Sequence, residues 1–118
     1  MSSIVGLQGK FKGNDIVKML KTSKNRGPDA SGVYLGDVKL NIDLDKFSDD
    51  NEYDIAFGQN LLCVYDTNER QDLPQPVSND KLVLVFDGVL YNFRTIRNLV
   101  GKVGVEAEIK SDAERCFI

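Results

Sequence analysis

The chain has 118 residues, of which 42% are hydrophobic and 28% charged, and its formal net charge at pH 7 is −3. This length suits one domain with a modest core, and the composition is typical of a globular protein. The acidic balance and the absence of basic clusters disfavour nucleic acid and anionic membranes as partners. No apolar run is long enough to cross a bilayer, and the first residues lack a signal-peptide pattern, so we expect a cytoplasmic protein.

Histidine is absent from the sequence, which removes Ser-His-Asp and Cys-His catalysis. Cys63 and Cys116 lie far apart between apolar residues, so we expect buried free thiols. A zinc site of Cys and His ligands is therefore excluded, and no cofactor is expected. Any acid–base chemistry must use carboxylates, lysine, tyrosine or a terminal amine.

In the first half of the chain, short apolar runs alternate with polar turns. Residues 3–7 are predicted to form a strand, and Gly13-Asn14 to cap a helix over residues 15–23. A constrained loop over residues 26–32 follows. A hairpin is then expected from residues 33–35 and 38–42 around Gly36-Asp37, followed by an exposed acidic loop over residues 43–54.

The second half contains the strongest apolar run, KLVLVFDG, which predicts a buried strand over residues 81–88. The other expected elements are strand segments at 55–57 and 61–65 separated by Gly58-Gln59-Asn60, a long loop at 66–80, a helix at 92–100, a strand at 105–109 and a helix capped at 111–112. Strands outnumber helices and most links are short, so the pattern favours an α+β fold with a largely antiparallel sheet.

The last residues begin a helix well and then stop. Ser111 and Glu114 form a capping-box pattern, which usually opens a helix. We interpret this ending as a shortened domain or one completed by another chain, and the alternative is a frayed terminal turn.

Four segments carry family signatures in a fixed order. They are MSSIVG, NRGPDASGVY, GQNLLCVYD with LPQPV, and LVFDGVLYNFRTIRNLV with SDAE. Together they resemble the glutaminase domain of class II glutamine amidotransferases, the N-terminal-nucleophile domain found in asparagine synthetase. The resemblance covers nearly the whole chain. It implies an αββα sandwich of the N-terminal-nucleophile hydrolase type, incomplete here, with residues 1–118 forming the N-terminal part of a single domain.

The resemblance also gives the constrained loop a place. In the family, the loop formed here by Arg26, Gly27, Pro28 and Asp29 is a conformational anchor beside the active-site end of the sandwich. Pro28 fixes one φ, and Gly27 permits backbone that other residues do not adopt. We therefore assign these residues to architecture rather than to catalysis.

The family hydrolyses glutamine to glutamate and ammonia with an N-terminal cysteine, whose own α-amine is the general base. This chain has Ser2 at that position, and removal of Met1 would be needed to free its amine. A hydroxyl is a much weaker nucleophile than a thiol near neutral pH. Ser2 is either a natural residue or a substitution for cysteine, and both remain open at this point.

At two further positions this chain differs from the residue that the family has, and at two others it matches it. Asp87 stands where an asparagine amide donates to the oxyanion, and Leu61 stands where an arginine clamps the glutamine carboxylate. Gly88, whose N–H forms the other half of the oxyanion hole, is retained, as is Asp112, which binds the substrate's amino group. Without the resemblance, Ser2 would be an ordinary terminal residue, Asp87-Gly88 a turn and Asp112 a helix cap.

Three functions follow from this reading. The first is a catalytically impaired glutaminase-like domain that binds glutamine or a related small amide, pairs with a synthetase partner or a second copy of the chain, or acts as a scaffold. The second is an active amidohydrolase that uses Ser2 on an amide carrying an amine but no α-carboxylate. The third is a structural fragment, the first half of a larger glutaminase domain, which is completed by a partner chain or dimerises.

Overall fold

The computed structural model describes residues 2–62, 76–79, 81–88 and 90–104. These residues form a mixed α/β structure with antiparallel sheets, as the sequence predicts. In chain order the elements are β1 (Ser3–Lys12), α1 (Gly13–Thr22), the short 3-10 helix η1 (Lys24–Arg26), β2 (Ala30–Tyr34), β3 (Val38–Lys39), β4 (Glu52–Leu61), β5 (Val77–Ser78), β6 (Val83–Leu84) and α2 (Phe93–Lys102).

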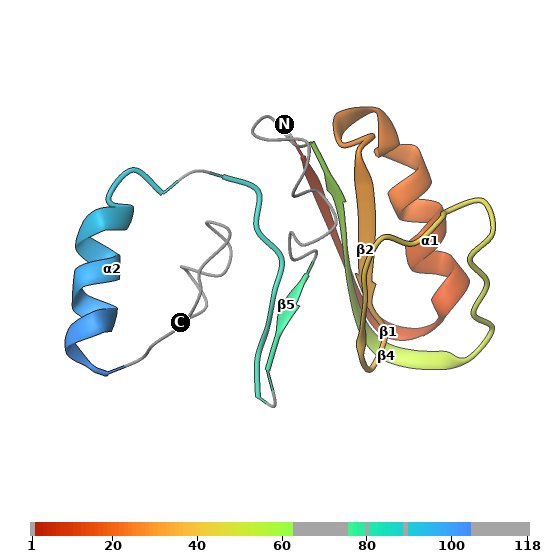
Figure 1. Ribbon diagram of the computed structural model, residues 1–118. Helices are drawn as coiled ribbons and strands as arrows, with labels where there is room; N and C mark the ends of the chain where they lie inside the picture. The colour runs from red at the N-terminus through yellow and green to blue at the C-terminus, as the bar shows by residue number, and fades with distance from the viewer. Residues whose placement is uncertain (1, 63–75, 80, 89, 105–118) are drawn as a thin grey trace.

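The main sheet has four antiparallel strands in the order β1-β4-β2-β3. β4 lies between β1 and β2, and its last residues pair with the start of both neighbours: Asn60 with Ser3, and Leu61 with Ala30. The start of the chain and the start of β2 therefore meet at the same end of the sheet (Figure 1).

Helix α1 covers one face of this sheet and forms the core with it. Ile16, Val17 and Leu20 follow the spacing of one helix face, and all three are buried. They pack against Val33 and Ala56 from the sheet. This burial of apolar surface fixes α1 on the sheet.

The β5–β6 hairpin and α2 lie on the other side of the main sheet. Figure 1 shows the β5–β6 hairpin on the side of the main sheet away from α1, with α2 beyond the hairpin. A hydrogen bond joins β4 to the segment that follows β6, because Gln59 Nε2 donates to the Phe86 carbonyl oxygen at 2.7 Å. Among the residues described, no helix is long and apolar enough to span a membrane.

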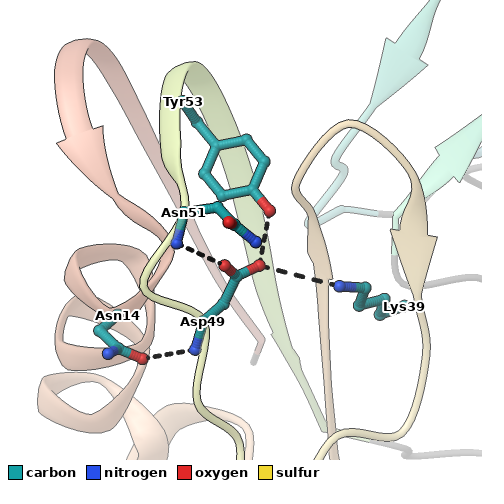
Figure 2. A network of polar contacts seen from close by, with 5 residues as sticks. All are labelled: Asn14, Lys39, Asp49, Asn51 and Tyr53. Carbon is teal, nitrogen blue, oxygen red and sulfur yellow. Dashed lines mark hydrogen bonds and ion pairs between the residues drawn. The ribbon is translucent and has the colours of Figure 1, made fainter.

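At the other end of the main sheet, Asp49 fixes the chain before β4 (Figure 2). Its carboxylate accepts hydrogen bonds from the Tyr53 hydroxyl at 2.6 Å and from the Asn51 N–H at 2.9 Å, and Lys39 Nζ lies 3.8 Å away. The Asp49 N–H donates to the Asn14 side-chain oxygen at 2.8 Å, which joins this loop to the start of α1. Residues 43–54 were predicted to be an exposed loop. This is wrong for Leu44 and Asp49, which are 7% and 8% exposed, and for residues 52–54, which belong to β4.

The predicted break at Gly58-Gln59-Asn60 is also wrong, because β4 runs unbroken from Glu52 to Leu61. Gly58 pairs with Val5 on one side and with Val33 on the other. A methyl group on Gly58 would lie within 3 Å of Leu20 side-chain atoms, so glycine is needed here to admit α1. It is a packing residue and does not end the strand.

The apolar run at residues 81–88 forms less strand than predicted. Only Val83–Leu84 is a strand, and Leu82 is 60% exposed. The predicted loop at residues 66–80 contains its partner, β5. β1 and α2 confirm the strand expected at residues 3–7 and the helix expected at 92–100, and β1 continues to Lys12. The predictions at residues 63–65, 105–109 and 111–112 lie outside the described residues.

Candidate functional site

Ser2 lies beside the end of β4. Its side chain is buried, and its hydroxyl oxygen accepts a hydrogen bond from the Leu62 N–H at 3.0 Å. The next residue, Ser3, pairs with Asn60, so the chain enters the sheet directly from Ser2. Leu61, the predicted position of the carboxylate clamp, is therefore a close neighbour of the predicted nucleophile position.

The constrained loop packs against the same end of β4. The Asp29 N–H donates to the Leu61 carbonyl at 3.0 Å. Gly27 is buried, and a side chain there would overlap the Asn60 carbonyl group. Arg26 and Pro28 are exposed on the outer side of the turn. The loop is shorter than predicted, because Arg26 ends η1 and β2 begins at Ala30.

A buried polar network holds the start of β1 in place. The Asn60 amide nitrogen lies 2.9 Å from the Leu20 carbonyl oxygen and within 3.2 Å of the hydroxyl oxygens of Ser3 and Ser23. The Ser31 hydroxyl donates to the Asn60 amide oxygen at 2.7 Å. This network joins α1, β1, β2 and β4 one residue away from Ser2. The sequence patterns did not predict a role for Asn60, because its partners come from four different segments.

The Phe86–Gly88 segment contacts β4 through Gln59. The Gln59 amide donates to the Phe86 carbonyl, while Asp87 and Gly88 are exposed. No hydrogen bond joins Ser2 to Asp87 or Gly88 among the described residues. The segment is therefore fixed to β4 two residues before Leu61, and Gln59 is the link. The sequence patterns did not predict a role for Gln59 either.

This end of the sheet contains both donors and acceptors, and Lys24 Nζ donates to the Ser31 hydroxyl at 3.1 Å. Ser2, Gln59, Leu61, Asp87 and Gly88 include one carboxylate and no cation. Asp112 lies outside the described residues. Within the described part of the chain, no group of three or more Cys, Asp or Glu side chains is arranged to hold a metal ion.

The sequence matches a known protein family over nearly its whole length. Residues 1–117 match the family described as "Glutamine amidotransferase domain". The chain belongs to this family. The family predicted from the four sequence segments is thereby confirmed.

One relative of this glutamine amidotransferase domain is the protein of Methanocaldococcus jannaschii named "Putative asparagine synthetase (glutamine-hydrolyzing) 2". The two sequences are 26% identical over 114 residues, which cover 85% of this chain and 19% of the relative. The chain thus spans about a fifth of the relative's length. No solved structure gave a significant match.

Proposed function

We propose that this glutamine amidotransferase domain has an N-terminal-nucleophile ancestry, no longer hydrolyses glutamine and now binds a small ligand. The single observation that carries this proposal is the state of Ser2. Its hydroxyl oxygen is buried and accepts the Leu62 N–H at 3.0 Å. That hydrogen bond uses one of the two lone pairs of the oxygen and holds the side chain against the end of β4, and the hydroxyl is already a weaker nucleophile than a thiol.

Leu61 supports the same conclusion. It lies at the end of β4 beside Ser2, where an aliphatic side chain offers no ion pair to a substrate carboxylate. A bidentate arginine pair is among the strongest contacts that a protein makes to a carboxylate. Binding of the α-carboxylate of glutamine would therefore lack its main anchor.

Asp87 is unsuited to stabilising an oxyanion. An asparagine amide would donate to the negative charge that develops during amide hydrolysis, whereas an ionised carboxylate donates nothing and repels it. Loss of one such donor slows catalysis by about a hundredfold to a thousandfold. Ser2, Leu61 and Asp87 thus weaken three separate parts of one reaction.

The order of the layers supports the N-terminal-nucleophile ancestry. α1, the main sheet, the β5–β6 hairpin and α2 follow one another across the molecule, which is compatible with an αββα sandwich (Figure 1). The relative is named as a glutamine-hydrolysing asparagine synthetase. We propose that the ancestral reaction supplied ammonia to a synthetase, and that the present domain retains a synthetase partner or pairs with a second copy.

The test is release of ammonia from L-glutamine. The protein is prepared with Met1 removed and its N-terminus verified as Ser2 by mass spectrometry. Ser2→Ala serves as the matched control, and an active glutaminase of the same family is the positive control. We expect no more ammonia from the protein than from Ser2→Ala. Turnover comparable to the active glutaminase and lost in Ser2→Ala would overturn the proposal in favour of an active Ser2 amidohydrolase.

A further inference from the structure

Gln59 carries a buried acceptor that no hydrogen bond within the described part of the chain satisfies. The side chain is 3% exposed, and its Oε1 atom has no partner there. The orientation of the amide is fixed by chemistry, because the Phe86 carbonyl oxygen can only accept and must face Nε2. The free atom is therefore the carbonyl oxygen.

Such an atom is unusual in a folded protein. Most buried polar side-chain atoms are hydrogen bonded, and a buried acceptor without a donor costs free energy. Gln59 gains one hydrogen bond to Phe86, but the second group of the same amide is unpaired within the described residues. Binding of a molecule with an N–H donor would satisfy that group.

The position of Gln59 connects this acceptor with the candidate site. Residues two apart on a strand share a sheet face, so Gln59 and Leu61 lie on the same face of β4. The Asn60 side chain lies between them in the sequence and donates to the Leu20 carbonyl of α1, so Asn60 is on the face that α1 covers. Gln59 and Leu61 are therefore on the opposite face. It looks toward the β5–β6 hairpin, whose chain continues to Phe86 and Asp87 (Figure 1).

The groups near the Gln59 oxygen indicate the kind of molecule that binds there. Gln59 offers an acceptor, Asp87 offers a carboxylate, and Leu61 replaces a cation with an aliphatic side chain. A ligand carboxylate would find no positive partner among these three residues and would be repelled by Asp87. A ligand N–H group meets an acceptor instead.

We propose that Gln59 is a ligand-binding residue of the candidate site, and that the site takes a small primary amide that carries no carboxylate. The free Gln59 oxygen accepts a hydrogen bond from the ligand's amide N–H. This inference rests on the proposed function and adds to it both the chemical class of ligand and the residue that selects it.

The test compares two ligands that differ in one group. L-Glutaminamide is L-glutamine with its α-carboxylate replaced by a carboxamide. Binding of each to the Met-processed protein is measured by calorimetry, together with ammonia release. We expect L-glutaminamide to bind at least about tenfold more tightly than L-glutamine, and the affinity for L-glutaminamide to fall severalfold in Gln59→Met. Gln8→Met, at an exposed position of β1, is the matched control and should leave it unchanged.

A spectroscopic measurement keeps the test decisive if Gln59→Met does not fold. In the unaltered protein, the side-chain amide signals of Gln59 should shift during titration with L-glutaminamide, while those of Gln8 stay in place. Equal or weaker binding of L-glutaminamide, or Gln59 signals that do not move, would overturn this inference alone. Hydrolysis of L-glutamine would instead overturn the proposed function, so the two failures are distinguishable.

Discussion

The Ser31 hydroxyl donates a 2.7 Å hydrogen bond to the Asn60 side-chain oxygen at a point where neither residue has any exposed surface. This bond joins β2 to β4, and the other side of the same amide reaches the Leu20 carbonyl at the end of α1. Ser2 and the loop containing Gly27 and Asp29 lie directly beside it. The candidate site is thus supported by the buried hydrogen bonds of Asn60 and not by apolar packing alone.

Asn60→Asp tests these hydrogen bonds with the smallest change in side-chain shape. The substitution replaces the donor nitrogen by a carboxylate oxygen that faces the Leu20 carbonyl, and it introduces a buried charge. We expect the free energy of unfolding to fall by about 3 kcal/mol or more. Urea denaturation provides the measurement. Asn25→Asp, at an exposed position of η1, should change it by less than about 0.5 kcal/mol, and an equal loss in both variants would contradict the assignment.

Gly27 and Gly101 are expected to respond in opposite directions to the same substitution. A methyl group on Gly27 would overlap the Asn60 carbonyl, whereas one on Gly101 in α2 would meet no atom within 4 Å. Gly27→Ala should therefore lower the free energy of unfolding by about 1–3 kcal/mol through overpacking. Gly101→Ala should raise it by about 0.5 kcal/mol, because alanine favours a helix. Thermal unfolding of the two variants measures both changes, and a neutral Gly27→Ala would contradict the close packing of the loop.

The Asp49–Tyr53 pair makes stability depend on pH at the acidic end. The hydrogen bond from Tyr53 lowers the pKa of Asp49 below its ordinary value of 3.8; burial opposes this, and the Asn51 N–H and Lys39 add to it. Because the pKa is lower in the folded protein, the stabilisation is present above 3.8 and is lost as pH falls through the lowered value. The difference in unfolding free energy between the wild type and Asp49→Asn should therefore shrink below about pH 4. A constant difference from neutral to acidic pH would contradict this.

At the alkaline end the same bond acts through Tyr53. Its hydrogen bond to Asp49 raises the pKa of the Tyr53 hydroxyl above the ordinary value of 10.0, with burial and the Asp49 charge acting in the same direction. The stabilisation is fully present below 10.0 and is lost as pH rises through the raised value. The advantage of the wild type over Tyr53→Phe in urea denaturation should therefore disappear in strongly alkaline solution. An advantage that persists there would show that the hydroxyl proton is not what Asp49 binds.

The sequence predicted what depends on short-range patterns and missed what depends on partners far away in the chain. The spacing of Ile16 and Leu20 predicted α1, and the Gly36-Asp37 turn predicted the hairpin of β2 and β3. Gly58 was misread as a strand break, because its role is to admit Leu20 from another element. Asp49 looked exposed for the same reason, since Asn14, Lys39 and Tyr53 come from separate elements.

At the candidate site, too, local motifs were predicted from the sequence and features that depend on distant partners were not. The family segments identified the end of β4 and the Gly27–Asp29 turn from local motifs. They gave no indication of Gln59 and Asn60, which lie in the third segment beside Leu61. Whether a strand residue faces α1 or the β5–β6 side depends on register, and only the pairing of β1, β4 and β2 fixes that register. Asn60 bonds the helix side and Gln59 bonds the hairpin side for this reason.

Introducing the residues that the family resemblance implies at the three proposed site positions provides the sharpest test of the proposed loss of activity. The variant combines Ser2→Cys, Leu61→Arg and Asp87→Asn and is compared with Ser2→Cys alone, both with Met1 removed. We expect the triple variant to release ammonia from L-glutamine at least about a hundredfold faster than the single variant, because the single variant has a thiol but lacks the side-chain donor to the oxyanion. The two added changes should separate in the kinetics. Leu61→Arg lowers KM by pairing with the α-carboxylate, and Asp87→Asn raises kcat by donating to the oxyanion. If Ser2→Cys alone matched the triple variant, Leu61 and Asp87 would have no part in the lost activity.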